Sequence, residues 1–315
     1  MPIERRKITD RNQWLQWRRS NLNASEIAAC FGLHPFLTFA QLVAQKHGVE
    51  GLGPDPESAL IRRGNALEDD ARDEVEKLHP QWEIVKNNDY FIDAEHRLGA
   101  TPDFLCVDPD RRGFGVLQTK VVANPIFRRE WQDDTPPYYA ILQTATEMLL
   151  ADAAWGAIAP LVIGDFSFEV PQVYVIERHP DAEHRLLDAA ANFWRKFDAD
   201  ELPTIDYDRD QKLIALLYPA EVPGKVVDLS TDNRVRKLLE TRELLRATKT
   251  DIEKRLEAAE TEIKAKIADA EIAIVDGWKV TLKQQHRKAH WTKESTFRVL
   301  RANRIIAKEG INADT

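Results

Sequence analysis

The sequence has few cysteines and no long apolar run, and each absence excludes a class of protein. Cys30 and Cys106 are the two cysteines among 315 residues, so a four-thiolate iron–sulfur cluster is excluded. Both lie in apolar surroundings, which is typical of buried thiols in a reducing cytosol. No stretch of 18 apolar residues occurs, so the sequence predicts no membrane span. The charged N-terminus is followed by no apolar run, and we expect a cytoplasmic protein without a secretory signal.

An excess of positive charge is also absent. The net charge is −8 at pH 7, which argues against indiscriminate binding to nucleic acid. Basic residues are nevertheless concentrated in the first twenty positions, at Arg5, Arg6, Lys7, Arg11, Arg18 and Arg19. A nucleic-acid partner therefore requires a local basic path rather than a basic surface. With 43% hydrophobic and 30% charged residues, the chain is globular and long enough to bury a large core.

The stretch 99–122 organises the chain. Its first half alternates apolar and polar residues and predicts a strand, 108–113 is a turn rich in Asp, Pro and Gly, and 114–122 predicts a more buried strand. Gln118 and Lys120 are two residues apart, so they share one face of the second strand. The register of a hairpin would allow Asp103, on the first strand, to face them.

A carboxylate, a second oxygen ligand and a lysine on one face suit metal-assisted attack on a phosphodiester. Carboxylate and carbonyl oxygens are the ligands that Mg²⁺ prefers. A bound metal polarises the phosphate, and a lysine can orient the attacking water or offset developing charge. Pro-Asp followed by Gln-x-Lys also arises by chance, so the flanking segments have to support the interpretation.

The flanking segments predict an α/β protein with a central mixed β-sheet flanked by helices. Helices are expected at 9–20, 59–79, 138–150 and 181–198, with strands between them. Glu68 lies beside the apolar stripe of the second helix and could face inward, although acidic runs are usually solvated. A long helix at 232–267 and a hairpin at 270–283 follow an irregular segment. We therefore expect two parts: a domain at 1–220 that contains the candidate metal site, and a helix–hairpin extension at 221–315.

These motifs resemble a known family when they are taken in order. Pro102-Asp103 with Gln118-Thr119-Lys120 resembles the PD-(D/E)xK nuclease motif, with Gln118 where that family has Glu or Asp. Over about residues 14–203 the chain is similar to the lambda-type phage alkaline exonucleases. The matching motifs are Trp-Leu-x-x-Arg, Ala-Ser-Glu-Ile at 24–27, Gly-Asn-x-x-Glu at 64–68, the hairpin, and Tyr139 with Gln143.

The resemblance implies a restriction-endonuclease-like core and a role for each matching residue. Asp103 would bind two Mg²⁺ ions, which Mn²⁺ may replace, together with Gln118, the carbonyl oxygen of Thr119, and Glu68. Lys120 would position the nucleophilic water, and Gln143 would lie near the scissile phosphate. Arg18 and Ser25 match residues that bind the 5′-terminal phosphate.

The resemblance also implies how such a protein works in a cell. Lambda-type exonucleases digest linear double-stranded DNA from 5′ to 3′ and leave a 3′ overhang for a single-strand annealing protein. Their fold implies a homotrimeric ring around the duplex. The expected partners are thus DNA ends, an annealing protein and two further copies of the chain, with no membrane, in a bacterial or phage-infected cell.

Gln118 leaves alternatives open. Glutamine keeps the length of glutamate and one carbonyl oxygen but loses the charge, so metal binding and catalysis should be weakened or lost. Two explanations stay open: a deliberate change that traps substrate, or a natural variant. A site-specific endonuclease on the same core and a catalytically dead DNA-end-binding protein are the competing hypotheses.

Overall fold

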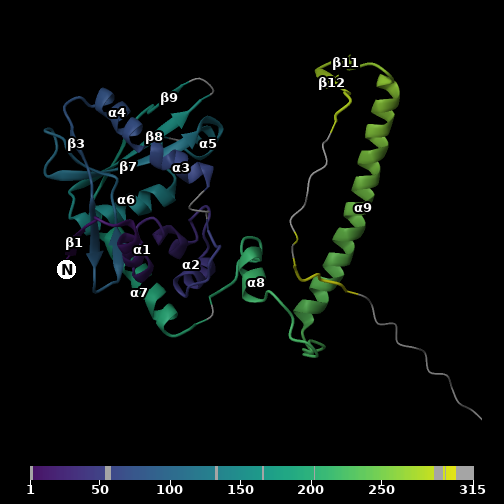
Figure 1. Ribbon diagram of the computed structural model, residues 1–315, viewed down its shortest axis with the longest axis horizontal. Helices are drawn as coiled ribbons and strands as arrows, with labels where there is room; N and C mark the ends of the chain where they lie inside the picture. The colour runs from purple at the N-terminus through teal and green to yellow at the C-terminus, as the bar shows by residue number, and fades with distance from the viewer. Residues whose placement is uncertain are drawn as a thin grey trace, which may run out of the picture. The chain divides into compact units, whose positions relative to one another are not determined.

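The computed structural model describes residues 3–53, 58–131, 134–164, 167–201, 203–286, 294 and 296–302. The chain divides into two units, Met1–Leu217 and Tyr218–Thr315, each of which is described by itself (Figure 1). In the described part of the chain, no helix has the length and apolar character that crossing a membrane requires.

A six-stranded mixed sheet forms the centre of the first unit. Five strands lie in the order β10-β8-β7-β6-β3, and β9 pairs with β8. Their bounds are β3 Glu83–Lys86, β6 Phe104–Val107, β7 Phe114–Ala123, β8 Trp155–Ile163, β9 Phe168–Glu169 and β10 Tyr174–Glu177. The long strands β7 and β8 pair in parallel, whereas the other pairs are antiparallel. The predicted α/β class with a mixed sheet is confirmed.

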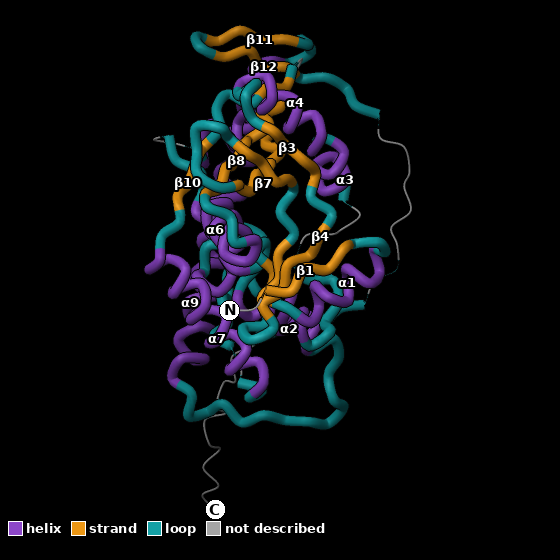
Figure 2. The backbone as a smooth tube through the Cα atoms, turned by 90° about the vertical axis from the view of Figure 1, so that its left-hand side faces the viewer, coloured by secondary structure: helices purple, strands orange, loops and turns teal. Residues whose placement is uncertain are grey.

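A second sheet of four strands lies in the same unit, in the order β1-β4-β5-β2. Figure 2 shows two of its strands, β1 and β4, side by side. Its strands are β1 Ile3–Lys7, β2 Leu22–Asn23, β4 Asp89–Asp93 and β5 Leu98–Ala100. The segment 83–93 therefore contains two strands, β3 and β4, in different sheets. Asn87 lies at the break, where its side-chain amide donates to the carbonyl oxygens of Asp89 and Pro102.

Helices cover both faces of the six-stranded sheet. The chain passes from β7 through α5 (Asn124–Glu130) and α6 (Tyr138–Ala151) to the parallel strand β8. Val116 of β7 packs in one core cluster with Met148 of α6, and the adjacent Leu117 packs in another with Val75 of α4 (Glu68–Leu78). Alternate residues of β7 therefore face α6 and α4 in turn.

The remaining helices of the first unit are α1 Arg11–Ser20, the short 3₁₀ helix η1 Ile27–Phe31, α2 Phe39–Lys46, α3 Ala59–Ala66, α7 Pro180–Asp198 and α8 Gln211–Leu217. Asp10 caps α1, as expected, by accepting from the backbone N–H of Asn12. The single helix predicted at 59–79 was wrong, because it is broken at Leu67 into α3 and α4. Glu68 consequently lies at the first position of a new helix.

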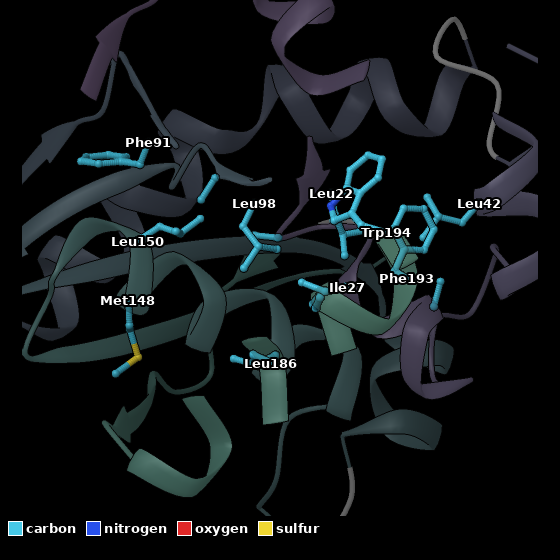
Figure 3. Close-up of a cluster of buried hydrophobic side chains, with 14 of the residues drawn as sticks. Leu22, Ile27, Leu42, Phe91, Leu98, Met148, Leu150, Leu186, Phe193 and Trp194 are labelled. Atoms are coloured by element: carbon cyan, nitrogen blue, oxygen red, sulfur yellow. The ribbon is translucent and has the colours of Figure 1, made fainter. Parts of the chain in front are cut away.

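The largest core cluster joins the two sheets to α6 and α7. Figure 3 shows Leu22, Leu98, Met148 and Phe193 among its buried side chains. Burying each such side chain fully stabilises the fold by about 1.5–3 kcal/mol. This core fixes α6 against β7, which positions the polar residues described below.

The second unit consists of one long helix and a hairpin. Helix α9 spans Asn233–Ile267 and is capped by Asp232, and β11 (Ile272–Val275) pairs with β12 (Trp278–Thr281). Gly277 in the turn has φ +75°, a conformation that glycine adopts without strain. The long helix and hairpin were predicted. Apolar residues along α9 are exposed at Leu238, Leu245, Ile252 and Leu256.

Candidate active site

The hairpin at the centre of the sequence is formed by β6 and β7, but Asp103 lies just before it. The pairing of Phe104 with Leu117 confirms the hairpin. The expectation that Asp103 belongs to a continuous strand was wrong, because the chain leaves β5 at Ala100 and enters β6, in the other sheet, at Phe104. Asp103 therefore occupies the crossing between the sheets, at the register position opposite Gln118.

Three hydrogen bonds converge on a single oxygen of Asp103. Its Oδ2 accepts from Nε2 of Gln118 at 2.7 Å, and from both the backbone N and Oγ1 of Thr119 at 2.8 Å. Burial raises the pKa of Asp103, and the charge of Lys120 and these three bonds oppose that rise. Oδ1 accepts none of the three bonds. The carboxylate is thus held rigidly by one oxygen.

The amide of Gln118 is buried and only half satisfied. Its side chain is 4% exposed, and Oε1 has no hydrogen-bond partner among the described residues. An unpartnered buried acceptor costs roughly 1–3 kcal/mol. Such an atom lies where a cation or a donor from a ligand could be bound.

A second set of contacts connects β7 to α6. Nζ of Lys120 donates to Oε1 of Gln143 at 2.8 Å, and Nε2 of Gln143 donates to Oε1 of Glu147 at 2.9 Å. Glu147 is 1% exposed. Burial, followed by the negative charge of Asp103, raises the pKa of Glu147 to about 8. Gln118 and Lys120 lie two residues apart on one face of β7, so the two sets of contacts are neighbours.

Glu68 approaches this site from α4. Its carboxylate pairs with Nζ of Lys86 at 3.7 Å. Burial and the negative charge of Asp103 raise the pKa of Glu68 to about 7. Glu68 is the first residue of α4, directly after the helix break at Leu67.

Arg18 and Ser25 form a pair beside the site. Nη2 of Arg18 donates to Oγ of Ser25 at 3.0 Å, and the guanidinium lies 4.9 Å from the ring centroid of Trp14. Trp14 in turn donates to Oγ1 of Thr101, two residues before Asp103. Glu26, directly after Ser25, occupies the N-cap of η1 and makes no side-chain cap bond.

A cleft of about 740 Å³ opens next to this pair. Its lining includes the cationic residues Arg18, Arg19, Lys46 and Lys212 and the carboxylate of Glu26. Lys46 is already bound by Glu26 at 2.8 Å and by two backbone carbonyl oxygens. The other cations give the cleft the local positive charge that a phosphate requires.

The structure brings five of the predicted residues into direct contact: Asp103 bonds Gln118 and Thr119, and Lys120 bonds Gln143. Among the described residues, no hydrogen bond or ion pair joins Glu68 or the Arg18–Ser25 pair to these five.

Glu147 is the residue that sequence reasoning missed, since it was placed on the helix without a role. The available signal was its position. It lies four residues after Gln143 on a helix face that also buries Ala140, Thr144 and Met148.

A cluster of metal-binding residue types elsewhere has a simpler explanation. Asp93, Glu95 and His96 place three ligand atoms within 4.8 Å of one another. Asp93 accepts from the backbone N–H groups of Glu95 and His96, and its other oxygen lies 2.6 Å from Nδ1 of His96. These bonds show that the cluster is a hydrogen-bonded turn that follows β4.

The fold and site define an α/β domain with carboxylate, amide and lysine groups gathered where two sheets meet. Residues 13–154 match the family model of the YqaJ-like viral recombinase domain. All eight predicted site residues and Glu147 lie within this segment. This segment of the chain is thus similar to the YqaJ-like viral recombinase domain, which agrees with the predicted resemblance to phage recombination nucleases. The similarity supports a nuclease that acts on DNA.

Individual relatives are distant. The chain is 22% identical over 284 residues to the uncharacterized protein YqaJ of Bacillus subtilis (strain 168), covering 87% of this chain and 83% of that protein. An alkaline exonuclease from Laribacter hongkongensis has 19% identity and a TM-score of 0.46, covering 66% of this chain and all of the other. A phage-related exonuclease from Haemophilus somnus 129PT has 16% identity and a TM-score of 0.42, covering 57% and 96%.

Proposed function

We propose that the protein is a Mg²⁺-dependent exonuclease that digests linear double-stranded DNA from 5′ to 3′. The observation that carries the proposal is the contact set of Asp103, Gln118, Thr119 and Lys120 beside the Arg18–Ser25 pair. The first four residues provide the groups for cleaving a phosphodiester, and the pair provides donors for a terminal phosphate. The 3′ overhang left by such digestion is a substrate for a single-strand annealing protein, which we propose as the partner.

The donor set fits Mg²⁺. Asp103, Glu68, the carbonyl oxygen of Thr119 and the unpartnered Oε1 of Gln118 are oxygen ligands, which Mg²⁺ prefers over nitrogen and sulfur. When bound, the two proposed ions polarise the phosphate and make a water molecule more acidic. Mn²⁺ uses the same ligand types and should substitute.

The protein's own residues orient the reactants. Lys120, held by Gln143, is placed to hydrogen-bond the attacking water and to offset negative charge on the phosphate. Arg18 has five N–H donors, of which one is bonded to Ser25, so its guanidinium can bind a terminal phosphate through two donors. Binding the 5′ phosphate there sets the polarity of digestion.

Gln118 lowers the metal affinity of this nuclease. A glutamate at this position would add a negative charge to the ligands, whereas the amide contributes a neutral oxygen. We therefore expect weaker metal binding and slower cleavage than in a variant with glutamate.

Digestion of linear and covalently closed circular duplex DNA, with and without Mg²⁺, tests the proposal. Release of nucleotides from linear DNA alone is expected, and Asp103→Asn should abolish it while Asp110→Asn, on the exposed turn after β6, leaves it unchanged. Cleavage of closed circles would instead identify an endonuclease. Binding to DNA ends with no cleavage, even in Gln118→Glu, would identify an end-binding protein.

A further inference from the structure

Glu147 is a buried carboxylate, and the charges of Lys120 and Arg18 oppose the rise in its pKa without cancelling it. It lies on the face of α6 that packs against the sheet, and it is 1% exposed. Its Oε1 accepts from Gln143, and its Oε2 has no hydrogen-bond partner in the described part of the chain. The ion pairs found among the described residues include none to Glu147. Removing an ionised carboxylate from water costs several kcal/mol unless a partner replaces the water.

A purely structural carboxyl group would have to be neutral and fully hydrogen-bonded. The raised pKa of Glu147, about 8, means that the proton is held near neutral pH when the site contains protein atoms alone. The unpartnered Oε2 shows that the second condition is not met. The fold therefore maintains an oxygen that its own groups do not satisfy, beside other oxygens of the site.

The position of Glu147 complements the missing charge at Gln118. Gln118 follows Val116 by two residues on β7, so both face α6, where Val116 packs in one cluster with Met148. Glu147 is adjacent to Met148, and Lys120 on the same strand face reaches Gln143 one helical turn earlier. The strand thus presents an unpartnered amide oxygen, and the helix packed on it presents an unpartnered carboxylate oxygen.

We propose that Glu147 supplies the second metal-binding carboxylate of this site, in place of the residue at position 118. The charge that is absent from the strand is then provided by the neighbouring helix, and the protein as it exists retains a metal site with Glu147 beside the carboxylates of Asp103 and Glu68. This inference rests on the proposed function. It makes Gln118 a tolerated native residue rather than an inactivating change.

Titration calorimetry with Mn²⁺ alone, without DNA, tests this assignment. Glu147→Gln should weaken Mn²⁺ binding at least tenfold, and adding Gln118→Glu to that variant should restore binding to within a few-fold of the unaltered protein. Glu83→Gln, at an exposed position on β3, serves as the matched control and should bind normally. Thermal unfolding without metal checks that each variant is folded. Should Glu147→Gln fail to fold, Glu147→Asp replaces it and is expected to bind more weakly than the unaltered protein.

The outcomes separate the inference from the function on which it rests. Normal Mn²⁺ binding by Glu147→Gln, with binding lost in Asp103→Asn, would overturn the role of Glu147 and leave the nuclease site intact. Normal binding by Asp103→Asn would overturn the proposed metal site itself. A third outcome is that Glu147→Gln binds Mn²⁺ weakly and that adding Gln118→Glu does not restore binding. The two positions would then not share a ligand role, and the proposal that Glu147 replaces the ligand at position 118 would be overturned.

Discussion

The side-chain amide of Gln118 donates a hydrogen bond to Oδ2 of Asp103 across 2.7 Å. A glutamate at position 118 has no N–H to donate, and an ionised one would place a second negative charge against a buried carboxylate. Without metal, glutamine is therefore the more stable residue at this position. A cation bound between the two side chains would make glutamate the more stable residue at position 118.

Gln118→Glu is expected to make both stability and activity depend more steeply on metal. In a chelator the variant should lose about 1–3 kcal/mol of unfolding free energy, because the hydrogen bond is replaced by repulsion. Mg²⁺ should recover that loss and raise the rate of digestion of linear duplex DNA above that of the unaltered protein. Urea unfolding and nucleotide release, each with and without Mg²⁺, measure the two effects.

Gln172→Glu is the matched control for that variant. Gln172 also donates its amide to a carboxylate, that of Asp134, but on the exposed surface. Its replacement should change stability little and should create no dependence on Mg²⁺. An equal response of both variants to metal, or no gain in digestion by Gln118→Glu with any divalent ion, would contradict the assignment of Gln118 to the site.

The raised pKa of Glu147 predicts a pH dependence of stability in the absence of metal. The carboxyl group holds its proton up to about pH 8 in the folded protein, whereas a model glutamate has a pKa of 4.5. Its contribution to stability is thus complete below about pH 4.5 and is lost as the pH rises through 8. Glu147→Gln should reduce the fall in unfolding free energy between these pH values by a few kcal/mol, at about 1.4 kcal/mol per unit of pKa.

Urea unfolding in EDTA at several pH values measures this dependence. Glu68, whose pKa is raised to about 7, should retain a smaller dependence of the same sign in the variant. Glu83→Gln is the control and should follow the unaltered protein. A pH profile of Glu147→Gln that superimposes on that of the unaltered protein would show that Glu147 is not held protonated in the fold.

The sequence predicted the elements that are specified locally. The β6–β7 hairpin and the turn at Gly277 follow from turn residues a few positions apart, and helix α9 follows from its periodic apolar residues. Those signals act within one element, so no tertiary contact was needed to find them.

What the sequence missed depends on contacts between distant segments. The crossing at Asp103 exists because β5 and β6 belong to different sheets, and alternation of apolar residues does not reveal which sheet a strand joins. The break at Leu67 interrupts a continuous helical pattern. The burial of Glu147 follows from the packing of α6 on β7, which a carboxylate in a helical pattern does not indicate. The predicted site residues were identified from the order of short motifs along the sequence. The additional carboxylate, Glu147, was identified only from its burial in the structure.

Arg18→Ala should remove the preference for a 5′-phosphorylated end. The guanidinium already bonds Ser25 and lies at a cleft lined by further cations, so its loss removes the donors best placed for a terminal phosphate. We expect initial rates on 5′-phosphate and 5′-hydroxyl ends to differ by tenfold or more before the change and by little after it. Arg11→Ala, which removes the same charge from the first turn of α1, should keep the preference. Equal rates on both ends in the unaltered protein would remove Arg18 from the site.

The final prediction concerns assembly. A protein with a net charge of −8 gains little from nonspecific attraction to DNA, so processive digestion requires another way to stay bound. A ring around the duplex provides one, and a cyclic ring joins unlike patches of neighbouring subunits. We expect light scattering to give about three times the monomer mass of 36.1 kDa over a wide range of concentrations. The exposed apolar residues of α9 are candidates for the contacts, and Leu245→Glu with Ile252→Glu should then lower the mass, whereas Ala247→Glu on the opposite face of the same helix should not. A stable monomer that still digests long DNA without dissociating would rule out the ring as the source of processivity.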